Sequence, residues 1–133
     1  MGVVVLDAGV IIAILESADA HHAAARAAVR DALDRGDQLC LPVSAYAEAL
    51  VRPFVSGREA ADTVDHFLDE MPAAVEAATQ DIARRASELR AKHGRRLRLP
   101  DALVVATAID RHATLIVTTH REWPTLPVET LVL

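Results

Sequence analysis

The chain has 133 residues, a net charge of −5 and a composition that is 52% hydrophobic but only 3% aromatic. This length fits one domain, residues 1–133, that can bury a core without disulfides, and the single cysteine, Cys40, excludes an internal disulfide and indicates a reducing compartment. No apolar run is long enough to span a membrane, and the apolar N-terminal stretch lacks the basic start and the cleavage site of a signal peptide. We therefore expect a cytoplasmic protein with no membrane partner.

Apolar runs alternate with helical patterns along the chain, which predicts an α/β domain with a central parallel sheet. In chain order we expect a strand at 3–6, helices at 9–16 and 21–35, a strand at 39–41, helices at 44–52 and 56–70, a strand at 73–75, helices at 79–93 and 100–112, and strands at 115–118 and 128–132. Pro53 is expected to end the third helix, and Ser56 with Glu59 to form a capping box for the fourth.

Asp7 directly follows the first predicted strand. Ligands of open α/β sheets bind beyond the carboxyl ends of the strands, which makes Asp7 a candidate ligand. Asp is also a good N-cap for the helix that begins near Gly9. The sequence leaves both roles open.

Asp101 lies in the first turn of the helix expected at 100–112. The helix dipole alone would favour a carboxylate there. The helical face of Asp101 is otherwise apolar, however, and carries Val104, Val105, Ala108 and Ile109. Asp110 lies on the opposite face, where a solvated acid belongs. A carboxylate on a buried face costs several kcal/mol unless it is compensated, so the pattern favours a bound cation at Asp101.

Glu48 follows the second predicted strand and stands four residues after Ser44, the expected N-cap. A capping box would place the acid one residue earlier, so capping does not explain Glu48. It borders the expected apolar face of Ala47, Leu50 and Val51. An exposed boundary residue and a metal ligand remain open as interpretations.

These three carboxylates offer only oxygen atoms, which suit Mg²⁺ or Mn²⁺ better than zinc. A basic stretch of Arg95, Arg96 and Arg98 precedes Asp101 and is either a solvated loop or a nucleic-acid contact, although the net charge counts mildly against nucleic acid. The motifs G-x-G-x-x-G, G-x-x-x-x-G-K-[ST] and G-x-S-x-G are absent, which excludes dinucleotide, P-loop and α/β-hydrolase sites.

Three segments together resemble the PIN-domain nucleases: VVVLDAGVIIAIL, LPVSAYAEAL and RLRLPDALVVATAIDRHATLIVTTHREW. Their order and spacing match that family over essentially the whole chain. A PIN domain of this length resembles the VapC-type toxins of bacterial type II toxin–antitoxin systems. The resemblance implies a three-layer α/β/α domain with a central parallel sheet of four to five strands.

The resemblance further implies a metal-dependent endoribonuclease that hydrolyses RNA phosphodiester bonds. Asp7, Glu48 and Asp101 occupy the positions of three acidic ligands of Mg²⁺ or Mn²⁺. Thr118 is expected to position a water molecule or the scissile phosphate, and the arginines to hold the RNA backbone. Such toxins form homodimers and are silenced by a cognate VapB-type antitoxin, whose C-terminal segment covers the active site.

The chain departs from the family pattern at two positions. Gly9 stands where the family usually has Ser, Thr or Asn, and His120 stands at the fourth acidic position, with Glu122 nearby. His120 and Glu122 are therefore candidate additional ligands. Two alternatives stay open, namely an inactive PIN-like binding module and an RNA-processing nuclease without an antitoxin.

Overall fold

A computed structural model describes all 133 residues. The elements are, in chain order, β1 (Val3–Leu6), α1 (Ala8–Leu15), α2 (His22–Asp34), β2 (Gln38–Pro42), α3 (Val43–Ser56), α4 (Arg58–Glu70), β3 (Ala73–Glu76), α5 (Gln80–His93), the 3₁₀ turn η1 (Gly94–Arg96), α6 (Leu99–Asp110), β4 (Leu115–Thr118) and β5 (Thr130–Val132). All of the expected strands and helices are present, with ends shifted by a few residues.

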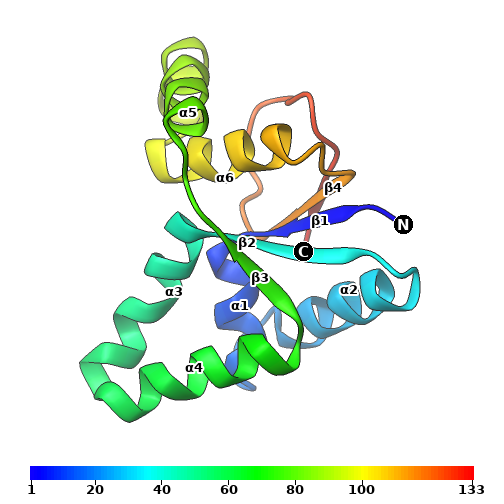
Figure 1. Cartoon of the computed structure of the whole chain (residues 1–133), viewed down its shortest axis with the longest axis vertical. Coiled ribbons are helices and arrows are strands. Elements are labelled where there is room, and N and C mark those ends of the chain that lie inside the picture. The colour runs from blue at the N-terminus through cyan, green and yellow to red at the C-terminus, as the bar shows by residue number, and fades with distance from the viewer.

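The five strands form one sheet in the order β3-β2-β1-β4-β5, and every neighbouring pair is parallel. Helices α5 and α6 cover one face of this sheet, and α1 to α4 cover the other (Figure 1). The central strands are buried on both faces, which explains why β1 and β4 are continuous apolar runs. The three-layer α/β/α prediction is therefore confirmed, with five strands.

The order of the strands reverses at β1. From β1 the chain moves through β2 to β3 at one edge, and it then returns to add β4 on the other side of β1. Ligands of open α/β sheets bind at such a switch point, outside the carboxyl ends of the strands. In this chain the switch point lies between β1 and β4.

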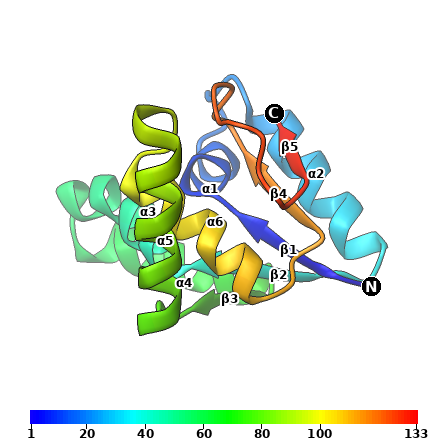
Figure 2. The same ribbon diagram turned by 90° about the horizontal axis from the view of Figure 1, so that it is seen from above.

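Helix α6 carries the chain back across the sheet. It lies between the sheet and α5, which packs across it (Figure 2). Seven of its twelve residues are buried, as expected for a helix that is apolar on nearly all sides. Its orientation is thus fixed by packing on two sides.

Two expected helix boundaries were wrong. Pro53 does not end α3, which continues to Ser56 and stops at Gly57, where φ is +134°. Pro53 is close enough to the end of the helix that it removes only one late hydrogen bond. Ser56 therefore belongs to α3, and α4 starts after Gly57 without a side-chain cap, so the predicted capping box does not form.

The apolar side chains form one core of 30 buried residues. Cys40 belongs to this core, and burial raises the pKa of its thiol to about 11. As expected, it behaves as a small hydrophobic residue, because a protonated and enclosed thiol is a poor nucleophile. No helix combines the length and the apolar character that crossing a bilayer would require.

Candidate metal centre

Asp7 stands at the carboxyl end of β1 and is only 3% exposed. Its Oδ1 accepts a hydrogen bond of 2.8 Å from the backbone N–H of Ala8, and its Oδ2 accepts one of 2.8 Å from the hydroxyl of Thr118. The first bond makes Asp7 the N-cap of α1. Both roles that the sequence left open are therefore structurally compatible, since one oxygen caps the helix and the other faces the switch point.

Thr118 is the last residue of β4 and is fully buried. Its hydroxyl donates its proton to Asp7 and accepts a hydrogen bond of 3.1 Å from the backbone N–H of His120. The side chain therefore links the ends of β1 and β4 and orients the carboxylate of Asp7.

Asp101 lies in the first turn of α6 and is 6% exposed. Three residues of the apolar face predicted for it, Val104, Val105 and Ala108, are buried, whereas Asp110 is exposed. The nearest cation on its own helix turn is Arg98, whose Nε lies 3.5 Å from Oδ2. Asp101 is thus a nearly enclosed carboxylate with one ion pair at the edge of the site.

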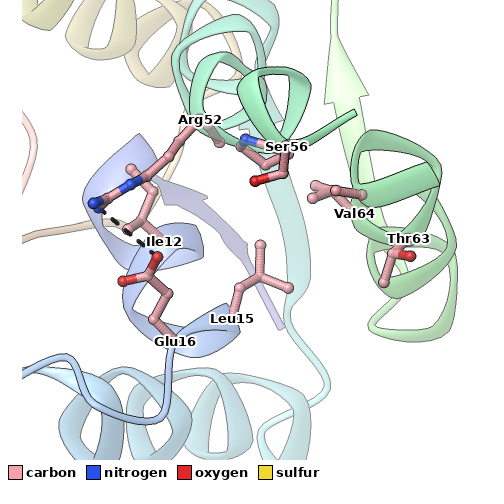
Figure 3. Close-up of a pocket in the computed structure, with 10 residues that line it drawn as sticks. Ile12, Leu15, Glu16, Arg52, Ser56, Thr63 and Val64 are labelled. Carbon is pink, nitrogen blue, oxygen red and sulfur yellow. Dashed lines mark ion pairs between the residues drawn. The ribbon is translucent and has the colours of Figure 1, made fainter. Parts of the chain in front are cut away.

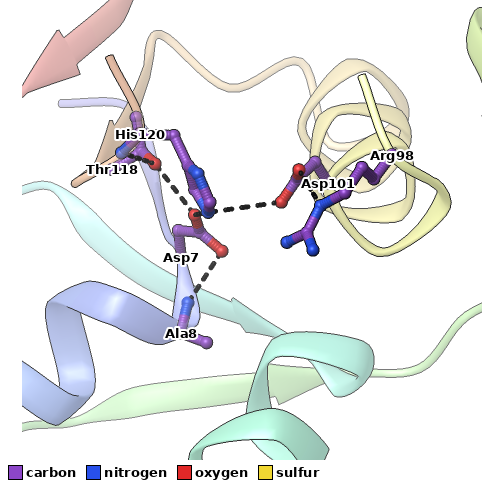
Figure 4. A network of polar contacts seen from close by, with 6 residues as sticks. All are labelled: Asp7, Ala8, Arg98, Asp101, Thr118 and His120. Atoms are coloured by element: carbon purple, nitrogen blue, oxygen red, sulfur yellow. Dashed lines mark hydrogen bonds and ion pairs between the residues drawn. The ribbon is translucent and has the colours of Figure 1, made fainter. Parts of the chain in front are cut away.

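The imidazole of His120 lies between these two carboxylates (Figure 4). Its Nε2 is 3.5 Å from Oδ1 of Asp101 and 3.8 Å from Oδ2 of Asp7. One donor atom from each of the three residues lies within 4.8 Å of the others. His120, a candidate because of its position in the sequence, therefore belongs to the innermost group.

Glu48 lies farther out on α3 and is exposed. The carboxyl group itself is partly desolvated, and this desolvation, followed by the charges of Asp7 and Asp101, raises its pKa. It is therefore within electrostatic reach of the pair, although it is not part of the innermost group. The buried face of α3 carries Ala45 and Ala49, and Leu50 packs against the core beside them. The expected apolar face was therefore wrong at Ala47 and Val51, which are exposed.

The innermost group has the chemistry of a cation site. Burial raises the pKa of Asp7, and the hydrogen bonds from Thr118 and Ala8 and the nearby His120 only partly offset this effect. The neighbouring charge of Asp101 raises it further. A divalent cation would favour the charged form of both carboxylates at once, and two oxygens with one nitrogen form a suitable donor set. The residues present therefore fit a divalent cation.

Gly9 follows the site in the first turn of α1. A Cβ added at Gly9 would collide with the hydroxyl oxygen of Thr119. The space that a side chain at position 9 would fill is therefore occupied by the hydroxyl of Thr119, which directly follows β4. Sequence reasoning missed Thr119, because only the tertiary structure brings it against Gly9.

A polar pocket of about 790 Å³ opens beside the acids. It is lined by Arg95, Arg96, Arg98, Asp101, His120, Arg121, Glu122 and Trp123. The structure thus brings the predicted arginines and Glu122 to the site and adds Arg121 and Trp123, which the sequence analysis missed. The pocket is locally positive, because its four arginines outnumber its two carboxylates, Asp101 and Glu122. Arg98 is the only one of the four arginines in an ion pair.

The indole of Trp123 stacks on the ring of His120, with centroids 5.6 Å apart and planes inclined by 13°. Two features of the sequence could have drawn attention to Trp123: it is the only tryptophan of the chain, and it follows β4 by five residues. That position alone does not reveal which ring it contacts.

The model of the PIN domain family matches residues 4–127. No curated protein matches the chain. Among solved structures, VapBC2 from Rickettsia felis, bound to a DNA fragment from its promoter, is similar with a TM-score of 0.72 and 14% identity, over 97% of this chain and 98% of that one.

Two further structures have the same fold. A toxin–antitoxin complex from Klebsiella pneumoniae aligns with a TM-score of 0.68 and 20% identity, over 93% of this chain and 92% of that one. VapC20 of Mycobacterium tuberculosis, described as a sarcin-ricin loop cleaving toxin, aligns with a TM-score of 0.66 and 19% identity, over 85% and 86%.

Glu48→Gln is expected to raise the melting temperature of the metal-free protein at neutral pH, by a few degrees at most. The raised pKa of Glu48 means that its charged form is disfavoured in the folded state. This penalty disappears as the pH falls through that pKa towards the ordinary value of 4.5, so the advantage of the variant should vanish there. Thermal melts in EDTA from pH 4.5 to pH 8 test this, with the exposed Glu88→Gln as control. A variant that melts lower at neutral pH would show that Glu48 is structurally required.

Gly9→Ala and Thr119→Ala are expected to be non-additive. Alanine in a helix is about 1 kcal/mol more favourable than glycine, but the new methyl would meet the Thr119 hydroxyl. Gly9→Ala should therefore be neutral or destabilising alone and stabilising, by about 0.5–1 kcal/mol, when Thr119→Ala is also present. Urea denaturation of the four proteins measures the coupling. Simple additivity would show that the two side chains do not compete for space.

Proposed function

This chain belongs to the PIN domain family, and from that premise we propose that it is a divalent-metal-dependent endoribonuclease that acts as a VapC-type toxin. One observation carries the proposal. Two buried carboxylates, Asp7 and Asp101, converge at the switch point of the sheet beside a pocket lined by arginines. Carboxylates can bind a divalent cation, and arginines can bind the phosphates of RNA. Metal-dependent cleavage of RNA requires both functions.

Asp7 and Asp101 would hold Mg²⁺ or Mn²⁺ directly, with Glu48 binding it directly or through water. A divalent cation in this position supplies Lewis-acid polarisation of the phosphodiester and lowers the pKa of an attacking water.

Other residues of the chain prepare the site for this reaction. The hydroxyl of Thr118 orients Asp7 by donating to Oδ2. Because Thr118 is fully buried, we assign it a positioning role and no direct contact with the phosphate. Arg95 and Arg96 are exposed at the pocket and would hold phosphates on either side of the scissile bond.

The proposed partner is a VapB-type antitoxin, and the proposed active form is a cytoplasmic homodimer. Solved relatives in toxin–antitoxin complexes support the partner. In this chain an apolar hollow of about 450 Å³ lies between α1, α3 and α4, with the ion pair of Arg52 and Glu16 at its rim (Figure 3). Beside it, α3 exposes Val51, Phe54 and Val55. Adjacent exposed apolar residues of this kind are typical of protein interfaces.

One observation favours a second candidate function. His120 replaces an acid in the innermost group, and a PIN-like module that has lost catalysis could tolerate that change. Such a module would still bind its partner, but it would not cut RNA in the presence of any divalent ion.

The nuclease proposal predicts that purified protein, free of antitoxin, cuts RNA with Mn²⁺ or Mg²⁺ and stops in EDTA. Asp7→Asn or Asp101→Asn should lower the cleavage rate about a hundredfold or more, because several kcal/mol of transition-state stabilisation depend on the cation. Asp110→Asn is the matched control, since it removes an exposed acid from the same helix as Asp101. Unchanged cleavage by the Asp101 variant would contradict the site, and no cleavage by the wild type in either ion would favour the binding module.

Phe54→Asp is expected to weaken the homodimer at least about tenfold while leaving the melting temperature of the monomer unchanged. Phe54 is 57% exposed in the isolated chain, so a charge costs little there but much inside an apolar interface. Light scattering over a concentration series measures this, with Val132→Asp on β5 as a control for an exposed apolar residue elsewhere. A wild type that stays monomeric at micromolar concentration would contradict the dimer.

A further inference from the structure

His120 brings a nitrogen donor into a site whose other close donors are carboxylate oxygens. Its Nε2 faces Oδ1 of Asp101 at 3.5 Å and Oδ2 of Asp7 at 3.8 Å. Two atoms bound to one octahedral ion at about 2.1 Å lie about 3 Å apart when adjacent and about 4 Å apart when opposite. Both separations from His120 fall between these values. The donor atoms of all three residues lie within 4.8 Å of one another, so they can surround one ion once they move somewhat closer together.

The imidazole is held in this position from two sides. Its backbone N–H donates to the hydroxyl of Thr118 at 3.1 Å, and the same hydroxyl is bonded to Asp7. Its ring stacks on Trp123. No hydrogen bond from the protein fixes the other ring nitrogen of His120, which is unusual for a metal-ligating histidine. Stacking therefore replaces the polar contact that normally orients such a ring.

Trp123 is suited to this role because its ring is itself fixed. The indole packs against the hydrophobic core, and its N–H is buried without an acceptor. A buried N–H without a partner is unfavourable, so hydrogen bonding does not explain the placement of this ring. What Trp123 offers to the site is its flat face, which restricts the rotation of His120.

We propose that His120 is a nitrogen ligand of the metal ion in this site, that Trp123 is the residue that positions its ring, and that the site therefore selects first-row transition ions over Mg²⁺. The inference rests on the proposed function only for the presence of a divalent ion. Mg²⁺ strongly prefers oxygen ligands, whereas imidazole binds transition ions with an affinity that increases from Mn²⁺ to Co²⁺.

Calorimetric titration of the metal-free protein with Mg²⁺, Mn²⁺ and Co²⁺ at pH 8 tests the selectivity. The affinity ratio of Co²⁺ to Mg²⁺ should fall about tenfold or more in His120→Asp, which keeps a ligand but replaces nitrogen with oxygen. His66→Ala, an exposed histidine on α4, is the matched control and should leave the ratio unchanged. Pulsed electron paramagnetic resonance of the Mn²⁺ form should show coupling to a histidine nitrogen in the wild type and none in His120→Asp.

Two substitutions at Trp123 separate positioning from general stability. Trp123→Phe keeps a stacking ring and should retain both the nitrogen coupling and the selectivity. Trp123→Leu removes the ring and should lower the affinity for Co²⁺ about tenfold, with little change for Mg²⁺. If Trp123→Leu weakens both ions equally, the effect is structural and the positioning role is overturned. Because Trp123 is the only tryptophan, quenching of its fluorescence by Mn²⁺ and not by Mg²⁺ reports occupancy beside it.

The result that overturns the ligand proposal alone is a wild type that binds Mn²⁺ and cuts RNA but shows no nitrogen coupling and the same selectivity as His120→Asp. A wild type that binds none of the three ions overturns this inference together with the metal-dependent nuclease. The two failures are thus distinguished by the binding isotherm, which does not depend on activity.

Discussion

The burial of two carboxylates side by side is the constraint on which the rest of this structure depends. Asp7 and Asp101 lie far apart in the sequence, and each is almost enclosed. The fold itself compensates part of their charge, because Asp7 caps α1 and Asp101 lies in the first turn of α6. The positive ends of two helix dipoles therefore face the pair. The guanidinium of Arg98 and the hydroxyl of Thr118 compensate a further part of the negative charge. A bound metal ion would compensate the rest.

That arrangement requires the topology in which it is found. The N-termini of α1 and α6 meet only because the chain leaves β1 towards one edge of the sheet and α6 brings it back to β4. The central strands are filled with apolar side chains on both faces, so polar groups have room only where these strands end. Thr118 joins the ends of β1 and β4 through one hydroxyl, which makes the geometry of the site a direct consequence of strand pairing.

Local patterns were enough to predict the elements and the two buried carboxylates. Asp7 follows an apolar run, and Asp101 interrupts an apolar helical face, so each position can be recognised from its neighbours in the sequence. The rule that a proline ends a helix failed at Pro53. A proline near the end of a helix removes few hydrogen bonds, and tertiary packing can offset their loss. The contacts of Thr119 with Gly9 and of Trp123 with His120 had no local signal. They depend on how the segment after β4 folds back over the site.

Net charge was a poor guide to this site for a physical reason. The chain carries −5 overall, yet the pocket beside the acids has four arginines and two carboxylates. Charges separated by more than about 8–10 Å are largely screened at physiological ionic strength, so a bound phosphate responds to the pocket and not to the distant acids. In the proposed function the two signs would have separate tasks: Asp7 and Asp101 would attract a cation, and the arginines of the pocket would attract phosphate. Each task depends on the other, because two uncompensated carboxylates would repel the phosphate that the arginines attract.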